Sequence, residues 1–201
     1  YFFEIDGAAL ETNRYGRHHL LNVAAAVAAA GALGLAPGEA AAAVSTASAV
    51  SGRGAIYEID GITFVDDSYN SNPSSLEAAL GSLMEMPEGG RRWLVLGDML
   101  ELGETSEELH AGMGAVCGKA GVDGLLTLGS HSMALSREAA VQRRAPDEIS
   151  HFLDHERLAA YLDSFLAEGD IVLAKGSRGM RMEKVIDEIE RLRDRARRRV
   201  D

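Results

Sequence analysis

The sequence has a single cysteine and no long hydrophobic run, and these two shortages exclude several classes of protein. Cys117 is the only cysteine in 201 residues, so no disulfide can form within the chain. This is usual for proteins of the reducing cytoplasm, where we expect the protein to act. The most apolar run, 23–36, is mostly alanine and glycine and is shorter than the roughly 20 residues that cross a membrane. Residues 1–6 lack the basic and apolar regions of a signal peptide, so we expect no membrane insertion.

Basic residues are also in the minority. Lysine and arginine number 20 against 31 aspartate and glutamate residues, which gives a formal net charge of -11 at pH 7. Such a surface as a whole repels nucleic acid, although a local pocket can still hold an anion. Residues 191–199 are rich in arginine, and a nucleic-acid-binding tail is one interpretation of them. The interleaved acids Glu188, Glu190 and Asp194 favour the other interpretation, a solvated helix end.

Several motifs that hold nucleotides, metals or catalytic serines are missing. The phosphate loop Gly-x4-Gly-Lys-Ser/Thr does not occur, and the only Gly-Lys pair, Gly118-Lys119, is followed by alanine inside a predicted helix. Gly112 and Gly114 lack the third glycine of a G-x-G-x-x-G motif. No histidine or cysteine cluster has zinc spacing, and no G-x-S-x-G elbow supports a serine hydrolase. We therefore expect no metal site and no complete phosphate site in this chain.

Two parts of the chain differ in composition and in the pattern of their apolar residues. Residues 1–54 are rich in alanine, with an expected strand at 1–5 and expected helices at 18–33 and 37–50, the second begun by Pro37. A strand and two helices make a poor independent core, so we expect this part to belong to a larger domain. The chain begins without methionine, inside the expected strand, which suggests that a preceding segment is missing.

Strand and helix patterns alternate regularly in residues 55–201. Asp60-Gly61 lies between two alternating segments and is a strong hairpin signal. Strands are expected at 56–59, 62–65, 93–96, 124–128, 148–152 and 171–174, and helices at 73–86, 106–120, 131–141, 156–166 and from 182 onwards. This alternation predicts an α/β, Rossmann-like fold in which helices cover both faces of a parallel sheet.

Ligands of such sheets bind beyond the carboxyl ends of the strands, and the segment 66–73 lies at such an end. It carries two carboxylates and two amides between an apolar strand and a helix. A capped strand-to-helix turn explains Asn72 and Pro73. It does not explain the adjacent acids Asp66 and Asp67, which could hold ribose hydroxyls or a metal. Both interpretations stay open at this point.

Two further strand ends are polar. Residues 97–103 are followed by His110 on a helix, from which the imidazole could reach the same crevice. A lone helical histidine is, however, more often a satisfied structural residue. Residues 175–179, Lys-Gly-Ser-Arg-Gly, precede a helix amino terminus and could bind a phosphate or a carboxylate. The alternative is a flexible glycine loop with solvated cations.

The order of these segments resembles that of the Mur ligases, and the resemblance covers nearly the whole chain. It rests on 16–22, 51–53, 66–73, 97–103 with His110, and 175–179. The sequences Asp-Asp-Ser-Tyr-Asn-x-Asn-Pro and Lys-Gly-Ser-Arg-Gly are similar to the branch that joins D-Ala-D-Ala to UDP-MurNAc-tripeptide, a peptidoglycan precursor. Agreement of five segments in order makes a chance match implausible.

The resemblance implies a three-domain ligase. Its first domain holds the UDP-sugar, its central P-loop domain holds ATP and Mg²⁺, and its Rossmann-like last domain brings the amino component. Residues 1–54 would be the helical carboxyl-terminal part of the central domain, and residues 55–201 the last domain. ATP would phosphorylate the tripeptide carboxylate, and the amine of D-Ala-D-Ala would attack the acyl phosphate. Without a phosphate loop, this chain alone is expected to be inactive and to bind no cofactor tightly.

The same resemblance implies residue roles. Asn22 would contact adenine, Arg53 the nucleotide phosphates and Asp67 the ribose. Contacts with the dipeptide or the reaction intermediate fall on Asn70, Asn72, Lys175, Ser177 and Arg178. His18 and His110 could support the site, and no catalytic residue is assigned.

The chain departs from the family pattern at three places. His19 replaces a usual asparagine but can still donate a hydrogen bond, Ser71 replaces a usual alanine, and residues 23–26 read Val-Ala-Ala-Ala where Ala-Leu-Ala-Ala is usual. Two other functions stay open: a stand-alone binding module that has lost catalysis, and a sibling Mur ligase that adds a different amino acid.

Overall fold

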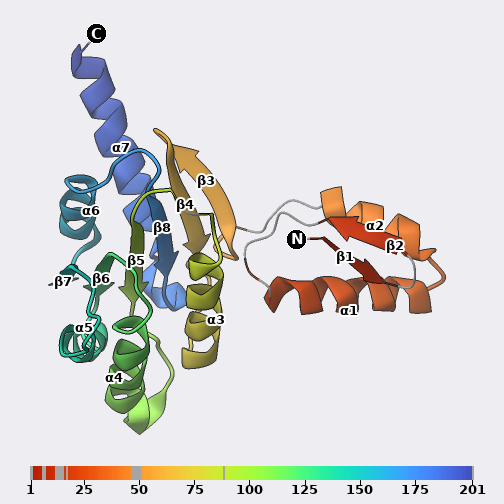
Figure 1. Cartoon of the computed structure of the whole chain (residues 1–201), viewed down its shortest axis with the longest axis horizontal. Helices are drawn as coiled ribbons and strands as arrows, with labels where there is room; N and C mark the ends of the chain where they lie inside the picture. Colours follow the sequence, from red (N-terminus) through yellow and green to blue (C-terminus); the bar gives the residue numbers. More distant parts are fainter. Residues whose placement is uncertain are drawn as a thin grey trace.

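The computed structural model describes residues 2–5, 8–11, 16, 18–46, 51–87 and 89–200 (Figure 1). The first four elements are the antiparallel hairpin β1 (Phe2–Ile5) and β2 (Ala8–Glu11), followed by the helices α1 (His18–Ala32) and α2 (Pro37–Thr46). The expected strand and both helices are present, whereas β2 was not predicted. The prediction that the second helix continues through 47–50 falls outside the described residues. Figure 1 shows these four elements set apart from the rest of the chain.

A hairpin opens the second part. Strands β3 (Ala55–Ile59) and β4 (Ile62–Asp67) pair antiparallel, and Asp60 and Gly61 form the two-residue turn between them. Both turn residues have positive φ angles, 50° and 73°. Aspartate tolerates this conformation and glycine adopts it freely, so this dipeptide fits the turn type that matches the twist of paired strands. The hairpin prediction is confirmed.

Strands and helices then alternate to the end of the chain. The elements are α3 (Pro73–Met84), β5 (Arg92–Gly97), η1 (Gly103–Thr105), α4 (Ser106–Cys117), β6 (Gly124–Leu128), α5 (Ser132–Ala140), β7 (Glu148–Phe152), α6 (His155–Asp163), β8 (Ile171–Lys175), η2 (Arg178–Met180) and α7 (Glu183–Val200). The six strands form one sheet in the order β3-β4-β8-β5-β6-β7. Only β3 pairs antiparallel. The predicted Rossmann-like α/β fold is therefore confirmed, as a mixed and mostly parallel sheet.

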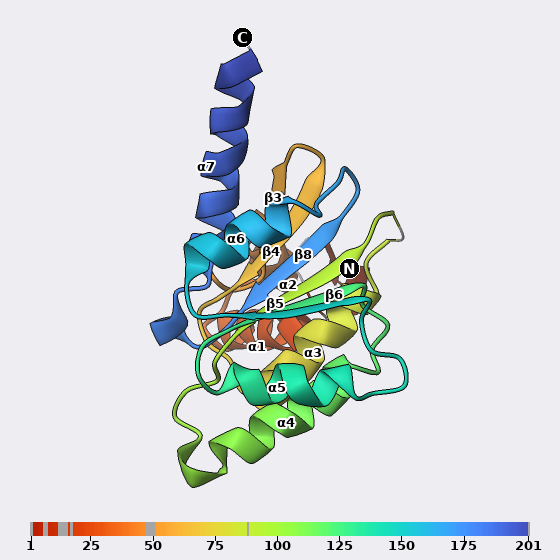
Figure 2. The same ribbon diagram turned by 90° about the vertical axis from the view of Figure 1, so that its left-hand side faces the viewer.

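Each face of the sheet packs against its own helices (Figure 2). Alternate residues of a strand point to opposite faces, so Val65 joins the core beneath α3, α4 and α5 while Phe64 joins the core beneath α6 and α7. Leu94 and Trp93 divide in the same way. All four are almost completely buried, and each such side chain contributes about 1.5–3 kcal/mol to folding. Among the residues that the structure describes, no helix is both long and apolar enough to cross a bilayer.

The arginine-rich end of the chain is helical. The end of α7 projects beyond the sheet in both ribbon views. Arg193 lies 2.6 Å from Asp163, and Arg197 lies 3.2 Å from Asp60 and 2.8 Å from Asp194. These pairings fit the interpretation as a solvated helix end.

The position of β8 fixes where the site forms. Although β8 comes last in the sequence, it lies between β4 and β5, and Lys175 is in register with both Asp67 and Leu96. The three strands therefore end at the same level. Their following segments, 68–72, 98–102 and 176–178, meet at one edge of the sheet, the edge at which open α/β sheets bind ligands.

Candidate functional site

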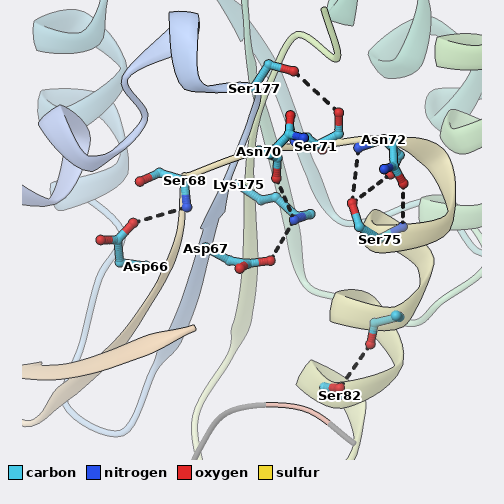
Figure 3. Close-up of polar contacts among 11 residues, drawn as sticks. Asp66, Asp67, Ser68, Asn70, Ser71, Asn72, Ser75, Ser82, Lys175 and Ser177 are labelled. Carbon is cyan, nitrogen blue, oxygen red and sulfur yellow. Dashed lines mark hydrogen bonds and ion pairs between the residues drawn. The ribbon is translucent and has the colours of Figure 1, made fainter. Parts of the chain in front are cut away.

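Asn72 begins helix α3 and caps it. Its Oδ1 atom accepts a hydrogen bond from the Ser75 amide at 2.9 Å, and Ser75 Oγ accepts one from the Asn72 amide at 3.0 Å. Pro73 occupies the first helical turn, as expected. Figure 3 shows this reciprocal pair at the start of the helix. The capped-turn interpretation is therefore confirmed for Asn72 and Pro73, and Asn72 is also exposed at the edge of the sheet.

Asp67 and Lys175 form a buried ion pair at the ends of β4 and β8. Lys175 Nζ lies 2.6 Å from Asp67 Oδ2 and donates a second hydrogen bond to the carbonyl of Asn70 at 2.9 Å. Only 3% of the Lys175 side chain and 12% of the Asp67 side chain are exposed. Lysine thus ties the loop after β4 to the neighbouring strand (Figure 3). The Asp67 Oδ1 atom has no hydrogen-bond partner within the described part of the chain.

Ser177 joins the segments that follow three different strands. Its Oγ accepts a hydrogen bond from the Leu100 amide at 2.8 Å and donates one to the Ser71 carbonyl at 3.3 Å. Its own amide donates to the Asp98 carbonyl at 3.0 Å. Ser177 is 4% exposed. The hydroxyl therefore links the edge loops from within rather than pointing to solvent.

Arg178 is the exposed cation of this edge. Its side chain is 63% exposed, and Nη1 lies 2.8 Å from Glu183 Oε1. A cavity of about 490 Å³ opens beside it, lined by Arg178, Gly179, Arg181, Glu183, Lys184 and Asp187. Three of these six residues are basic, and the cavity lies at the start of α7, where backbone N–H groups also favour anions.

Asp66 and Asp67 have different partners, which explains why two acids are adjacent. Alternation along β4 points them to opposite faces of the sheet. Asp66 Oδ2 accepts a hydrogen bond from the Gly52 amide at 2.9 Å, and its Oδ1 accepts one from the Ser68 amide at 3.2 Å. Asp66 is 2% exposed. It holds the segment that precedes β3, a role that was not predicted from the sequence.

Arg53 lies over the ring of Tyr69. The guanidinium carbon is 4.0 Å from the ring centroid, a cation–π distance. Arg53 is exposed, and Tyr69 is 46% exposed. The arginine expected near the nucleotide phosphates thus lies against the loop that follows Asp67 and carries Asn70.

His110 supports the loop after β5. The imidazole is fully buried; its Nε2 accepts a hydrogen bond from the Met99 amide at 2.9 Å, and its Nδ1 lies 2.7 Å from the Ser106 carbonyl. Nδ1 must therefore carry the proton, since a carbonyl can only accept. Met99 precedes Leu100, whose amide Ser177 holds. His110 is a satisfied structural residue that positions the edge loop.

Asp98, in the polar segment 97–103, is a second buried acid. Its Oδ1 accepts hydrogen bonds from the Ser132 amide at 2.7 Å and the His131 amide at 3.1 Å. A carboxylate at the start of helix α5 is stabilised by the free N–H groups there. The available signal was an acid directly after an apolar strand.

Asn22 and His18 come from the first part of the chain. Asn22 is exposed on α1, and within the described residues no hydrogen bond joins it to the edge of the sheet. His18 is the first residue of the same helix, and its side chain lies outside what the structure describes. The structure thus brings Asp67, Asn70, Asn72, Lys175, Ser177 and Arg178 to one edge, and not Asn22.

A groove on the α7 face is acidic. It has a volume of about 400 Å³, and its lining includes Glu58, Asp66, Glu183, Asp187 and Glu190. Burial, followed by repulsion from Glu183 and Asp66, raises the pKa of Asp187, while Arg191 opposes this shift. No group of three or more potential metal ligands occurs among the residues that can be described.

The chain is similar in sequence to known proteins. The family described as "Mur ligase, glutamate ligase domain" matches residues 52–178. Over 176 residues the chain is 35% identical to the UDP-N-acetylmuramoyl-tripeptide--D-alanyl-D-alanine ligase of Bacillus subtilis, covering 87% of this chain and 38% of that protein. The ligase of the same name from Escherichia coli is 37% identical, over 85% of this chain and 36% of that protein. The chain therefore spans little more than a third of the length of these relatives.

Solved structures show the same similarity. MurF ligase from Thermotoga maritima in complex with ADP superposes with a TM-score of 0.78 at 25% identity, covering 95% of this chain and 45% of that one. MurF from Acinetobacter baumannii gives a TM-score of 0.82 at 26% identity, covering 92% and 40%. The fold, the polar edge of the sheet and the sequence agreement lead to one conclusion: the chain belongs to the Mur ligase family.

Proposed function

We propose that this chain is the carboxyl-terminal part of an ATP-dependent ligase that joins D-Ala-D-Ala to UDP-MurNAc-tripeptide in the cytoplasm, a step of peptidoglycan-precursor synthesis. One observation carries the proposal. The end of β4 carries Asp67 and Asn70, and the end of β8 carries Lys175 and Arg178. The two strand ends are joined by the 2.6 Å ion pair between Lys175 and Asp67 and by the hydrogen bond from Lys175 to the Asn70 carbonyl. The relatives whose names state this activity support the choice of amino component.

ATP and Mg²⁺ would be held largely by a preceding domain. The described residues contain no cluster of metal ligands, and the sequence has no phosphate loop. The side chains of this chain can contact the sugar, the phosphates and the base of a nucleotide. Asp67 Oδ1 can accept from ribose hydroxyls, Arg53 can reach the phosphates, and Asn22 can contact adenine if the first part of the chain closes over the edge. ATP supplies the phosphoryl group that activates the tripeptide carboxylate.

The amino component would bind at the exposed residues of the edge. Arg178 can hold the dipeptide carboxylate by two parallel hydrogen bonds, and Arg181 and Lys184 line the same cavity. The exposed amides of Asn70 and Asn72 can bond to the dipeptide backbone. Once the dipeptide is held in this way, its amine can attack the acyl carbon, a C–N bond forms, and the C–O bond to phosphate breaks.

Lys175 and Ser177 would act differently from Arg178. Both are buried, and their polar atoms already bond to the edge loops. We therefore assign them to positioning Asp67, Asn70 and Leu100 rather than to touching the dipeptide. This refines the role that the family resemblance implies for them.

Two experiments test the proposal. Reading the gene upstream of Tyr1 should show a Gly-x4-Gly-Lys-Ser/Thr motif in the same frame; a start codon at that point would favour a stand-alone binding module. With ¹⁸O in the tripeptide carboxylate, the full-length enzyme should release inorganic phosphate that carries the label. Unlabelled phosphate would exclude the acyl phosphate.

A further inference from the structure

The segment before β3 is held to the edge of the sheet at one residue, Gly52. Its amide donates to Asp66 Oδ2 at 2.9 Å, and its carbonyl accepts from the Tyr69 amide at 2.8 Å. Both polar groups of this backbone unit are therefore bonded to residues at the end of β4. Gly52 itself is buried.

The contact requires glycine. Gly52 has a φ of +77°, and an added Cβ would lie 3.1 Å from the Tyr69 amide nitrogen and 3.3 Å from Ser68 Oγ. A side chain would be strained by the backbone conformation and would push the two segments apart. The closest of these distances, to the Tyr69 nitrogen and Ser68 Oγ, show how closely the two segments pack.

Asp66 suits this task because both of its oxygens accept from backbone N–H groups. Oδ2 accepts from the Gly52 amide, and Oδ1 accepts from the Ser68 amide. An asparagine would present its NH₂ group to one of these donors, so one hydrogen bond would become a repulsive contact. Asp66 is 2% exposed, so the loss of either hydrogen bond should be costly.

The hydrogen bonds of Gly52 also determine where Arg53, the next residue, lies. Its guanidinium carbon lies 4.0 Å from the centroid of the Tyr69 ring, so the backbone before it and its own side chain both rest on the loop after β4. Asp67, the last residue of β4, directly precedes this loop. Arg53 is therefore held against the end of β4, near Asp67, by its own contact with the Tyr69 ring and by the hydrogen bonds of Gly52.

We propose that Asp66 is the positioning residue for Arg53: it clamps Gly52 so that Arg53 travels with the 55–201 domain and meets the nucleotide phosphates while Asp67 meets the ribose. The role of Arg53 toward the nucleotide rests on the proposed function. The clamp itself is a property of this chain. The two can therefore be tested separately.

Hydrogen exchange of this chain tests the clamp. The Gly52 amide should exchange about 100-fold more slowly than an open amide, and Asp66→Asn should remove most of that protection. Asp170→Asn is the matched control, because Asp170 is equally buried and accepts from the Arg91 amide at 2.8 Å and Trp93 Nε1 at 3.2 Å. It should lower overall stability and leave the Gly52 protection pattern in place. An unprotected Gly52 amide in the unmutated chain would overturn the proposal.

A double-mutant cycle in the full-length ligase tests the consequence. Asp66→Asn should raise the KM for ATP about tenfold, because a misplaced arginine loses most of its phosphate contact. Arg53→Ala should raise it at least as much, and adding Asp66→Asn to Arg53→Ala should change it no further. Tyr69→Phe, which keeps the ring, should behave as wild type, whereas Tyr69→Ala should raise the KM.

The outcomes separate the two proposals. Additive effects of Asp66→Asn and Arg53→Ala, or an unchanged KM in Asp66→Asn, overturn the positioning role while the ligase assignment stands. A wild-type enzyme that forms no peptide bond overturns the ligase assignment, and with it the ATP role of Arg53. The exchange measurement then still decides whether Asp66 clamps Gly52.

Discussion

The ammonium of Lys175 lies 2.6 Å from a carboxylate oxygen of Asp67, and the two residues are 108 positions apart in the sequence. They meet because β8 inserts between β4 and β5 and ends in register with β4. The pair is almost shielded from water, with side-chain exposures of 3% and 12%. It holds the loop after β4 in the place where the proposed substrates meet.

Replacing Lys175 should therefore destabilise the chain strongly. Lys175→Met leaves Asp67 nearly buried and without its cation, and breaking a buried pair in this way costs about 3 kcal/mol or more. Denaturation in urea measures the change. The double variant Lys175→Met with Asp67→Asn should recover part of the loss, because no isolated charge remains. A loss under about 0.5 kcal/mol, as at an exposed surface pair, would contradict the account.

Replacing Arg178 should, in contrast, change the stability little and the binding of the dipeptide strongly. Its ion pair with Glu183 is exposed, so Arg178→Ala should change stability by no more than about 1 kcal/mol. In the full-length ligase it should raise the KM for D-Ala-D-Ala about 10- to 100-fold, the effect of losing a charge-assisted hydrogen bond. The KM for ATP should change much less. Equal effects on the two substrates would remove Arg178 from the dipeptide site.

His151 should make stability depend on pH. Burial lowers its pKa below the ordinary value of 6.5; Asp98 opposes this shift and Arg137 adds to it. Its Nδ1 lies 2.9 Å from Thr127 Oγ1, and its Nε2 is buried without a partner among the described residues. The unfolded chain therefore takes up the proton first as the pH falls. Stability should be complete above pH 6.5 and decline as the pH falls from there through the lowered pKa.

Urea denaturation between pH 5 and pH 8 measures this effect. His151→Gln should flatten the decline below pH 6.5, with a difference of at most about 1 kcal/mol because the side chain is only partly buried. An identical pH dependence in both proteins would show that another group titrates.

Nucleotide affinity distinguishes this chain from the proposed full-length ligase. Without a phosphate loop, the chain should hydrolyse no ATP and should bind it with a dissociation constant weaker than about 1 mM. Calorimetric titration checks this. Tight binding to these 201 residues would mean that the edge of the sheet holds the phosphates by itself.

Local patterns predicted most of the fold. The alternating segments around Asp60-Gly61 indicated the hairpin, and the spacing of apolar residues indicated the strands and helices of 55–201, because side-chain periodicity reports which face of an element is buried. Strand β2 was missed because its sequence, Ala-Ala-Leu-Glu, favours helix and only its pairing with β1 makes it a strand.

The sequence predicted which residues lie at this edge of the sheet, but it did not predict how they bond to one another. Asp67, Asn70 and Lys175 could be placed at strand ends from the sequence. That Lys175 bonds to Asp67 depends on the order of strands in the sheet, which no local pattern contains. The partners of Asp66 and Asp98 were not predicted for the same reason, since Gly52 and Ser132 become their neighbours only in the folded chain.

Amine selectivity of the full-length ligase is the most direct measurement of the central claim. The enzyme is given ATP, Mg²⁺, UDP-MurNAc-tripeptide and an equal mixture of D-Ala-D-Ala and single amino acids, and the products are separated by mass. We predict UDP-MurNAc-pentapeptide, with one ADP and one phosphate released for each peptide bond formed. A product that carries a single added amino acid, or no ATP-dependent product at all, would contradict the account.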